Sequence, residues 1–230
     1  MIKLIMLEIK KFKLFNYWKA VSICNIAIIA VLIMTYFIEI EEGLEIFVNF
    51  EMVANLIGVM VRTTFTIFAS VLIVKLIIDE YKNKSIDVLF SYPIKRKRIF
   101  SAKLTIVFMF TFTIVLISTL LLEGLVLLVD LNFNVLPGEV ESQDMSKHLL
   151  TVFMNSLATA GISLIPLLVG MRRKSGPATI VTSILIATIL NSQNMGFTLF
   201  SIIAIPLSLG LFGILSGFYS IRNIEKKDLV

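Results

Sequence analysis

The sequence has little of what most soluble proteins and enzymes depend on. Of its 230 residues, 57% are apolar and 16% are charged, against about 25% charged in a typical soluble domain. A single cysteine, Cys24, excludes an internal disulfide and a cysteine-based metal cluster. A single histidine, His148, excludes the multi-histidine sites of many metalloenzymes. High hydrophobicity with low charge also excludes a disordered chain, so the composition indicates an integral membrane protein.

Motifs for nucleotide and metal chemistry are missing as well. The sequence contains no G-x-x-x-x-G-K-[ST] loop, which would cradle the phosphates of ATP, and no H-E-x-x-H zinc motif. We therefore expect no enzyme activity, no metal site and no cofactor bound by this chain itself.

Long apolar runs are what the sequence has instead. Six of them follow one another, at about residues 21–38, 54–78, 104–129, 148–170, 178–190 and 197–219. About 20 apolar residues cross a bilayer as a helix, and the shorter fifth run fits a thin, tilted or partly re-entrant segment. We predict an all-α integral membrane protein whose six transmembrane helices form a single transmembrane domain over residues 17–219.

The two ends of the chain have a different pattern. In residues 1–16 several lysines accompany Ile2, Ile5, Ile9 and Phe12, which recur at helical spacing. This pattern predicts an amphipathic helix on the cytoplasmic surface of the membrane. Residues 220–230 are polar and predict a cytoplasmic tail.

The charges are distributed by side of the membrane. All but three of the 21 lysines and arginines fall in segments 1–19, 79–103, 172–174 and 222–227, which are separated by pairs of predicted spans. The intervening segments 39–51 and 130–144 are acidic. Basic loops stay in the cytoplasm, so both termini are predicted to be cytoplasmic. The net charge of +5 then reflects membrane orientation and predicts no nucleic-acid partner.

The longest polar segment between two spans is the cytoplasmic stretch 79–103. Within it, Ser85 is placed to cap a short helix, and Pro93 ends this helix near Tyr92, because the residue before a proline disfavours the helical conformation. One face of the helix is apolar and consists of Ile86, Leu89, Phe90 and Pro93. A cytoplasmic helix with such a face fits the groove of a partner protein. A basic loop with an incidental helical turn is the alternative, and these residues alone leave both open.

The same segment resembles the coupling helix in the permeases of type 2 ABC exporters. The residues that match the family pattern are Glu80, Leu89, Ser91, Pro93, Arg96 and Lys103. Lys84 departs from it, because many members have glycine before the helix. The resemblance implies a coupling helix at about 85–92 that contacts a separate cytosolic ATP-binding subunit, on which ATP and Mg would be bound. The implied contact residues are Glu80, Ser85, Ile86, Leu89, Phe90, Tyr92, Pro93 and Arg96.

The resemblance also implies a function. It implies the permease subunit of an ATP-driven exporter in a bacterial cell membrane, paired with a second permease, identical or different. Small permeases of this kind resemble exporters of bacitracin, lantibiotics and peptide toxins, so the expected cargo is an amphipathic or hydrophobic peptide, for export or immunity. The alternative is a non-transporting immunity or scaffold protein that binds a peptide or a membrane partner. It predicts no ATP-binding subunit.

Three polar residues lie inside predicted spans at a similar distance from their outer ends. Arg62, Glu123 and Asn155 are each about 12 Å deep at a rise of about 1.5 Å per residue. Because exposure of such groups to lipid is costly, we expect a polar layer facing the interior of the bundle. Our hypothesis is a cargo path or gate in which Arg62 pairs with Glu123. A purely structural ion pair, or an arginine reaching outward to the interface, is the alternative.

Small residues and prolines mark further positions in the spans. Gly210, Gly213 and Gly217 would let another helix approach closely, either within the bundle or in a second subunit. Pro166 and Pro206 are expected to kink their helices.

Overall fold

The computed structural model describes residues 2–42, 49–82, 96–133, 142–192, 200 and 202–222. These ranges are helical apart from short turns, and they contain no strand, as an all-α membrane protein requires. The predicted coupling helix at 85–92 and most of the predicted tail at 220–230 lie outside the described residues.

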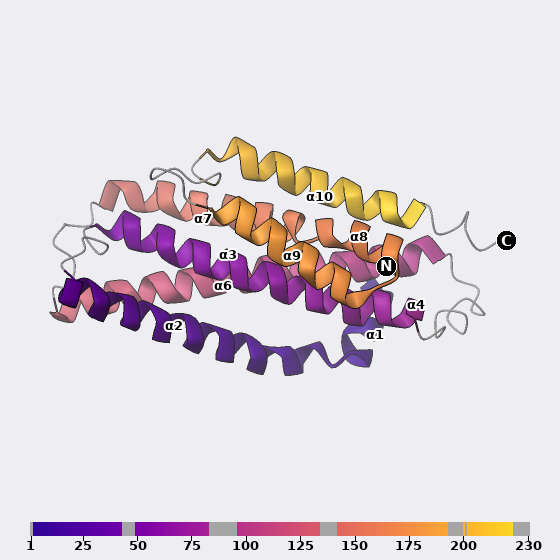
Figure 1. Cartoon of the computed structure of the whole chain (residues 1–230), viewed down its shortest axis with the longest axis horizontal. Coiled ribbons are helices and arrows are strands. Elements are labelled where there is room, and N and C mark those ends of the chain that lie inside the picture. The colour runs from indigo at the N-terminus through magenta and orange to yellow at the C-terminus, as the bar shows by residue number, and fades with distance from the viewer. Residues whose placement is uncertain are drawn as a thin grey trace.

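The helices lie side by side in one elongated bundle (Figure 1). In chain order they are α1 (Ile2–Lys11), η1 (Leu14–Asn16), α2 (Tyr17–Glu42), α3 (Phe50–Ile73), η2 (Val74–Ile78), α4 (Asp79–Lys82), α6 (Arg96–Phe133), α7 (Ser142–Ile162), α8 (Ile165–Arg173), α9 (Gly176–Asn191) and α10 (Ala204–Arg222). The helix α3 lies at the centre, because it packs against α6, α7 and α9.

Four helical segments are long and apolar enough to cross a membrane. They are Tyr17–Glu42, Phe50–Ile78, Lys97–Asn132 and Met145–Arg173, and they coincide with the first four predicted spans. The apolar helices Gly176–Asn191 and Ala204–Ser220 are shorter and coincide with the fifth and sixth. The multi-pass character is therefore confirmed, whereas the count of six spans stays a prediction.

The prolines act at the beginnings of helices. Pro166 stands in the first turn of α8, and a turn at residues 163–164 separates α8 from α7. The expected interruption is confirmed, because proline lacks the N–H that a continuous helix would need and its ring crowds the preceding turn. Pro206 lies in the first turn of α10, where a helix needs no N–H donor, so the kink expected there is wrong.

The predicted N-terminal helix is present over residues 2–11 as α1, and its place at the membrane surface stays a prediction. Ile5 and Ile9 of α1, and Phe12 directly after it, are partly buried and pack on the apolar cluster around η2. In Figure 1, α1 lies at the same end of the bundle as α4, the α8–α9 turn and the end of α10. This end therefore gathers the segments that the sequence analysis assigned to the cytoplasm, and that assignment itself stays a prediction.

The helices α7 and α10 approach each other through glycines. A Cβ added to Gly161 would lie 2.5 Å from the carbonyl oxygen of Gly210, and one added to Gly213 would overlap the carbonyl of Gly161. Gly217 faces the side chains of Leu104 and Leu164. Of the two possibilities that the sequence left open for these glycines, the structure shows packing within the bundle.

The close contact between α7 and α10 predicts that alanine will affect the free energy of unfolding differently at two glycines. Gly213→Ala should lower the free energy of unfolding by about 1–3 kcal/mol, because the added methyl group cannot fit against the backbone of α7. Gly124→Ala in α6 is the matched control. Nothing lies within 4 Å of its added Cβ, so it should leave stability unchanged or raise it by about 0.5–1 kcal/mol. The measurement is unfolding of the two purified variants in detergent, and equal stabilities would contradict the packing described here.

Candidate functional site

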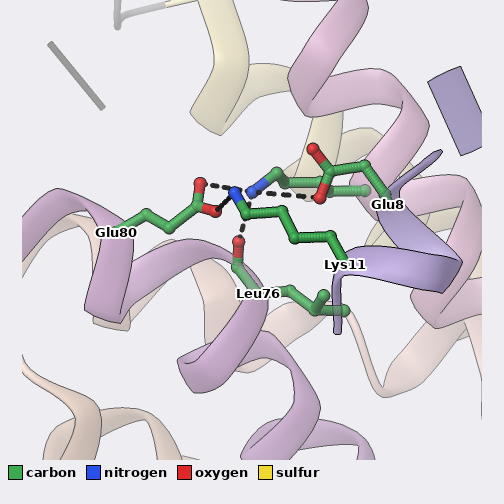
Figure 2. A network of polar contacts seen from close by, with 5 residues as sticks. Glu8, Lys11, Leu76 and Glu80 are labelled. Carbon is green, nitrogen blue, oxygen red and sulfur yellow. Dashed lines mark hydrogen bonds and ion pairs between the residues drawn. The ribbon is translucent and has the colours of Figure 1, made fainter. Parts of the chain in front are cut away.

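The first candidate site is a cluster of four charged side chains at the α1 end of the bundle. We call it the four-charge cluster; it consists of Glu8, Lys11, Glu80 and Lys103 (Figure 2). Lys103 is 1% exposed, and its Nζ donates hydrogen bonds to the carboxylate of Glu80 and, at 2.7 Å, to the carbonyl oxygen of Leu76. The Nζ of Lys11 lies 2.7 Å from Oε1 of Glu80.

Glu8 approaches the cluster from α1. Its Oε2 lies 3.6 Å from Nζ of Lys103, and Figure 2 shows Glu8 and Glu80 on opposite sides of the cluster. The ring of Phe12 lies 5.2 Å from Nζ of Lys103 and 5.0 Å from Nζ of Lys11. Two cations thus meet two carboxylates and an aromatic face, which offsets the cost of burying these charges.

A π-helical turn brings the backbone into the cluster. At η2 the hydrogen bonds run one residue further than in an α-helix, as shown by the N–H of Asp79, which donates to the carbonyl of Val74. Leu76, in the middle of this turn, presents its carbonyl to Lys103. Such wide turns are rare and are frequently found at functional sites.

The four-charge cluster joins the two chain segments that flank residues 83–95. Glu80 is in α4, which ends at Lys82, and Lys103 is in α6, which begins at Arg96. The pair therefore holds together the two ends of the segment predicted to contain the coupling helix. Of the predicted contact residues, Glu80 lies in α4 before this segment and Arg96 begins α6 directly after it. Ser85, Ile86, Leu89, Phe90, Tyr92 and Pro93 lie outside the described residues.

Sequence reasoning missed the part of α1 in this cluster. Lysines near a membrane surface are common, so Lys11 gave no signal of its own. Glu8 did give one, because it lies at helical spacing from Ile5 and Phe12 and therefore on the apolar face of α1. A carboxylate on a buried face requires a cation from another element.

The second candidate site is a polar cavity of about 550 Å³ between α3, α6 and α7. All three polar residues singled out in the sequence line it: Arg62, Glu123 and Asn155. The lining extends from the start of α3 at Glu51, which is exposed, to Arg62, which is 8% exposed. These two residues are separated by about 16 Å along the helix. The polar cavity therefore leads from one end of the bundle into its interior.

The predicted pair between Arg62 and Glu123 does not form. Oε2 of Glu123 lies 3.1 Å from Nε2 of His148, whose ring also contacts Phe50 edge to face. Nε of Arg62 donates to Oδ1 of Asn191 at 3.2 Å, and its guanidinium carbon lies 4.2 Å from the centre of the Phe200 ring. The sequence predicted one polar layer, and all three residues line the polar cavity, but it did not predict their partners. Asn191, the last residue of α9, and Phe200 had no predicted role.

Neither site has the composition of a metal centre. Within the described ranges, no group of three or more His, Cys, Asp and Glu side chains is placed to hold a metal ion. At one end of the bundle, the four-charge cluster joins α1, α4 and α6 by ion pairs. At the other end, the polar cavity provides space between α3, α6 and α7.

Comparison with known proteins adds family information. A family model described as ABC-2 family transporter protein matches residues 4–194, a range that contains the four-charge cluster and the lining of the polar cavity. The chain is also 37% identical over 225 residues to YcbO of Bacillus subtilis (strain 168), an uncharacterized protein, with 98% of this chain and 99% of that protein covered. No solved structure matches the chain.

The four-charge cluster predicts different losses of stability for its two lysines. Lys103→Met leaves two buried carboxylates without their central cation and should cost about 3–5 kcal/mol of unfolding free energy. Lys11→Met is the control, because the Lys11 side chain is 49% exposed and its ion pair is worth at most about 1 kcal/mol. Denaturant unfolding of the purified variants in detergent measures both. Similar losses would show that Lys103 is not the centre of the cluster.

Proposed function

The chain belongs to the ABC-2 family of transporter proteins, and from this premise we propose that it is the membrane subunit of an ATP-driven exporter. Family membership and the long apolar helices make it a multi-pass protein of the bacterial cell membrane. ABC-2 membrane proteins are permease subunits that work with a separate ATP-binding subunit, so we expect that partner here. The observation that carries the proposal is the four-charge cluster, because it anchors both ends of the segment that would contact such a partner.

In this proposal, the coupling helix at about 85–92 docks on the ATP-binding subunit through its apolar face. A movement of that helix would reach α4 and α6 together, since the Lys103–Glu80 pair holds them to each other. The movement would also reach α1 through Glu8. A single loose helix end would absorb the displacement, whereas three joined elements transmit it to the bundle.

The route to the other end of the molecule is a continuous helical rod. The segments α3, η2 and α4 follow one another without a break from Phe50 to Lys82. Glu80 in the four-charge cluster and Arg62 in the polar cavity lie on this rod, about 27 Å apart along its axis. We propose that rotation or translation of the rod changes the shape of the polar cavity during transport.

We propose that the polar cavity forms part of the cargo path. Its lining combines charged and amide groups with apolar side chains such as Phe50, Val115 and Val152. Such a mixture suits an amphipathic peptide, which is the cargo that we propose, for export or for immunity of the producing cell. A second permease, a copy of this chain or a relative, would complete the pore.

The coupling step is tested by inverting the polarity of the helix face. Leu89→Asp with Phe90→Asp should abolish co-purification with the ATP-binding subunit and the rise in its ATPase activity, because two carboxylates cannot enter an apolar groove. Leu89→Met with Phe90→Leu is the control, since it keeps the face apolar and should retain both properties. The measurements are pull-down of the two subunits and phosphate release in proteoliposomes.

If the doubly acidic variant keeps the complex and its stimulated ATPase, the coupling assignment is wrong. If no ATP-binding subunit associates even with the unaltered chain, the non-transporting immunity or scaffold protein is the better account.

A further inference from the structure

We propose that the polar cavity binds the free C-terminal end of a peptide, with the terminal carboxylate on Arg62 and a peptide N–H on Asn155. That the peptide is cargo rests on the proposed export function. That it binds rests on Arg62, Asn155 and the cavity that they line.

Arg62 is oriented by one hydrogen bond and one aromatic ring. Oδ1 of Asn191 accepts the hydrogen bond from Nε, and Nδ2 of Asn191 donates to the carbonyl of Ala187 at 2.9 Å, which orients the amide. The ring of Phe200, itself 6% exposed, covers one face of the guanidinium. Gly58 leaves room for it, because a Cβ there would lie 2.7 Å from Nη1.

No carboxylate of the described residues forms an ion pair with Arg62. The buried acid that lines the same cavity, Glu123, is bonded to His148. A buried cation without an anion is costly, and an amide and a ring offset only part of that cost. A guanidinium presents two parallel N–H donors that match a carboxylate, so the missing anion is most simply supplied by a ligand in the cavity.

A second unsatisfied group indicates what else the ligand carries. Oδ1 of Asn155 is buried and accepts no hydrogen bond, whereas other atoms of Asn155 line the polar cavity, so a rotation of the side-chain amide would turn this oxygen toward the cavity. An acceptor of this kind needs an N–H or O–H donor. The neighbouring hydroxyls of Thr119, Thr151 and Ser156 cannot supply one, because each already donates to a backbone carbonyl four residues earlier.

A peptide C-terminus has both required groups at its end. The carboxylate fits Arg62, and the amide N–H groups next to it fit Asn155. The cavity volume of about 550 Å³ lies within the usual range for small ligands, about 300–1,000 Å³, which admits the last residues of a peptide but not a folded domain. The exposed rim at Glu51 and Asn55 leaves an open route for the rest of the chain.

The test compares two forms of one probe on the purified full-length chain in zwitterionic nanodiscs. The probe is N-acetyl-Ala-Leu-Leu, once with a free carboxylate and once as the carboxamide, and the readout is equilibrium binding. The acid should bind at least about tenfold more tightly than the amide, because the amide loses the charge-assisted pair. Arg62→Gln should abolish that preference. Lys75→Gln is the matched control, since Lys75 is a cation of the same helical rod that lies over Tyr17 and outside the cavity lining, and it should retain the preference.

A second variant covers the case in which Arg62→Gln fails to fold. Asn155→Leu leaves Arg62 intact and should weaken the acid and the amide by a similar factor, several-fold, because it removes an acceptor that both probes use. Equal binding of acid and amide to the unaltered chain would overturn the proposal, as would an unchanged preference in Arg62→Gln.

The remaining outcome concerns a lipid. If nanodiscs containing phosphatidylglycerol stabilise the unaltered chain but not Arg62→Gln, while the peptide acid shows no preference, the anion is a lipid headgroup and the peptide assignment is wrong. These experiments need no ATP-binding subunit. Their failure therefore moves the cargo site elsewhere, whereas failure of the coupling test removes the export function and leaves the binding result standing.

Discussion

The ammonium group of Lys103 lies where three separate parts of the chain meet, and the arrangement of the α1 end of the bundle depends on it. Its hydrogen-bond acceptors come from the π-helical turn and from α4, and an ion-pair partner, Glu8, comes from α1. An amine that is 1% exposed must keep these partners, because water is not there to replace them. One buried cation on α6 therefore contacts α1, the π-helical turn and α4 at the same point.

The buried and partly buried cations at the two ends of the bundle have different kinds of partner. At the α1 end, each lysine of the four-charge cluster contacts a carboxylate, and these ion pairs join α1, α4 and α6. At the other end, Arg62 has an amide and an aromatic ring for partners, and it faces a cavity. Glu80 of the four-charge cluster and Arg62 of the polar cavity lie on the same helical rod, so the proposed displacement at one end would reach the other.

Composition and periodicity were sufficient to predict the class of protein, the first four long apolar helices, the N-terminal helix α1 and the break at Pro166, because these follow from hydrophobic length and from backbone chemistry. The grouping of Arg62, Glu123 and Asn155 at one cavity also followed from counting residues along helices. Their partners did not, because a helix rotates its side chains by about 100° per residue and small differences in rotation and tilt decide which polar groups meet. The π-helical turn at Val74–Ile78 left no pattern in an apolar run. The role of Gly213 could not be chosen from sequence, since packing within a chain and between chains uses the same small residues.

The balance of charges in the four-charge cluster has a consequence for a protein in an energised membrane. Moving one elementary charge across the full membrane potential involves about 2.3 kcal/mol per 100 mV. Two ammonium and two carboxylate groups that move together carry no net charge, so the electric field does no net work on their displacement. In the proposed exporter, the displacement of these four groups would therefore follow the ATP-binding subunit and not the voltage across the membrane.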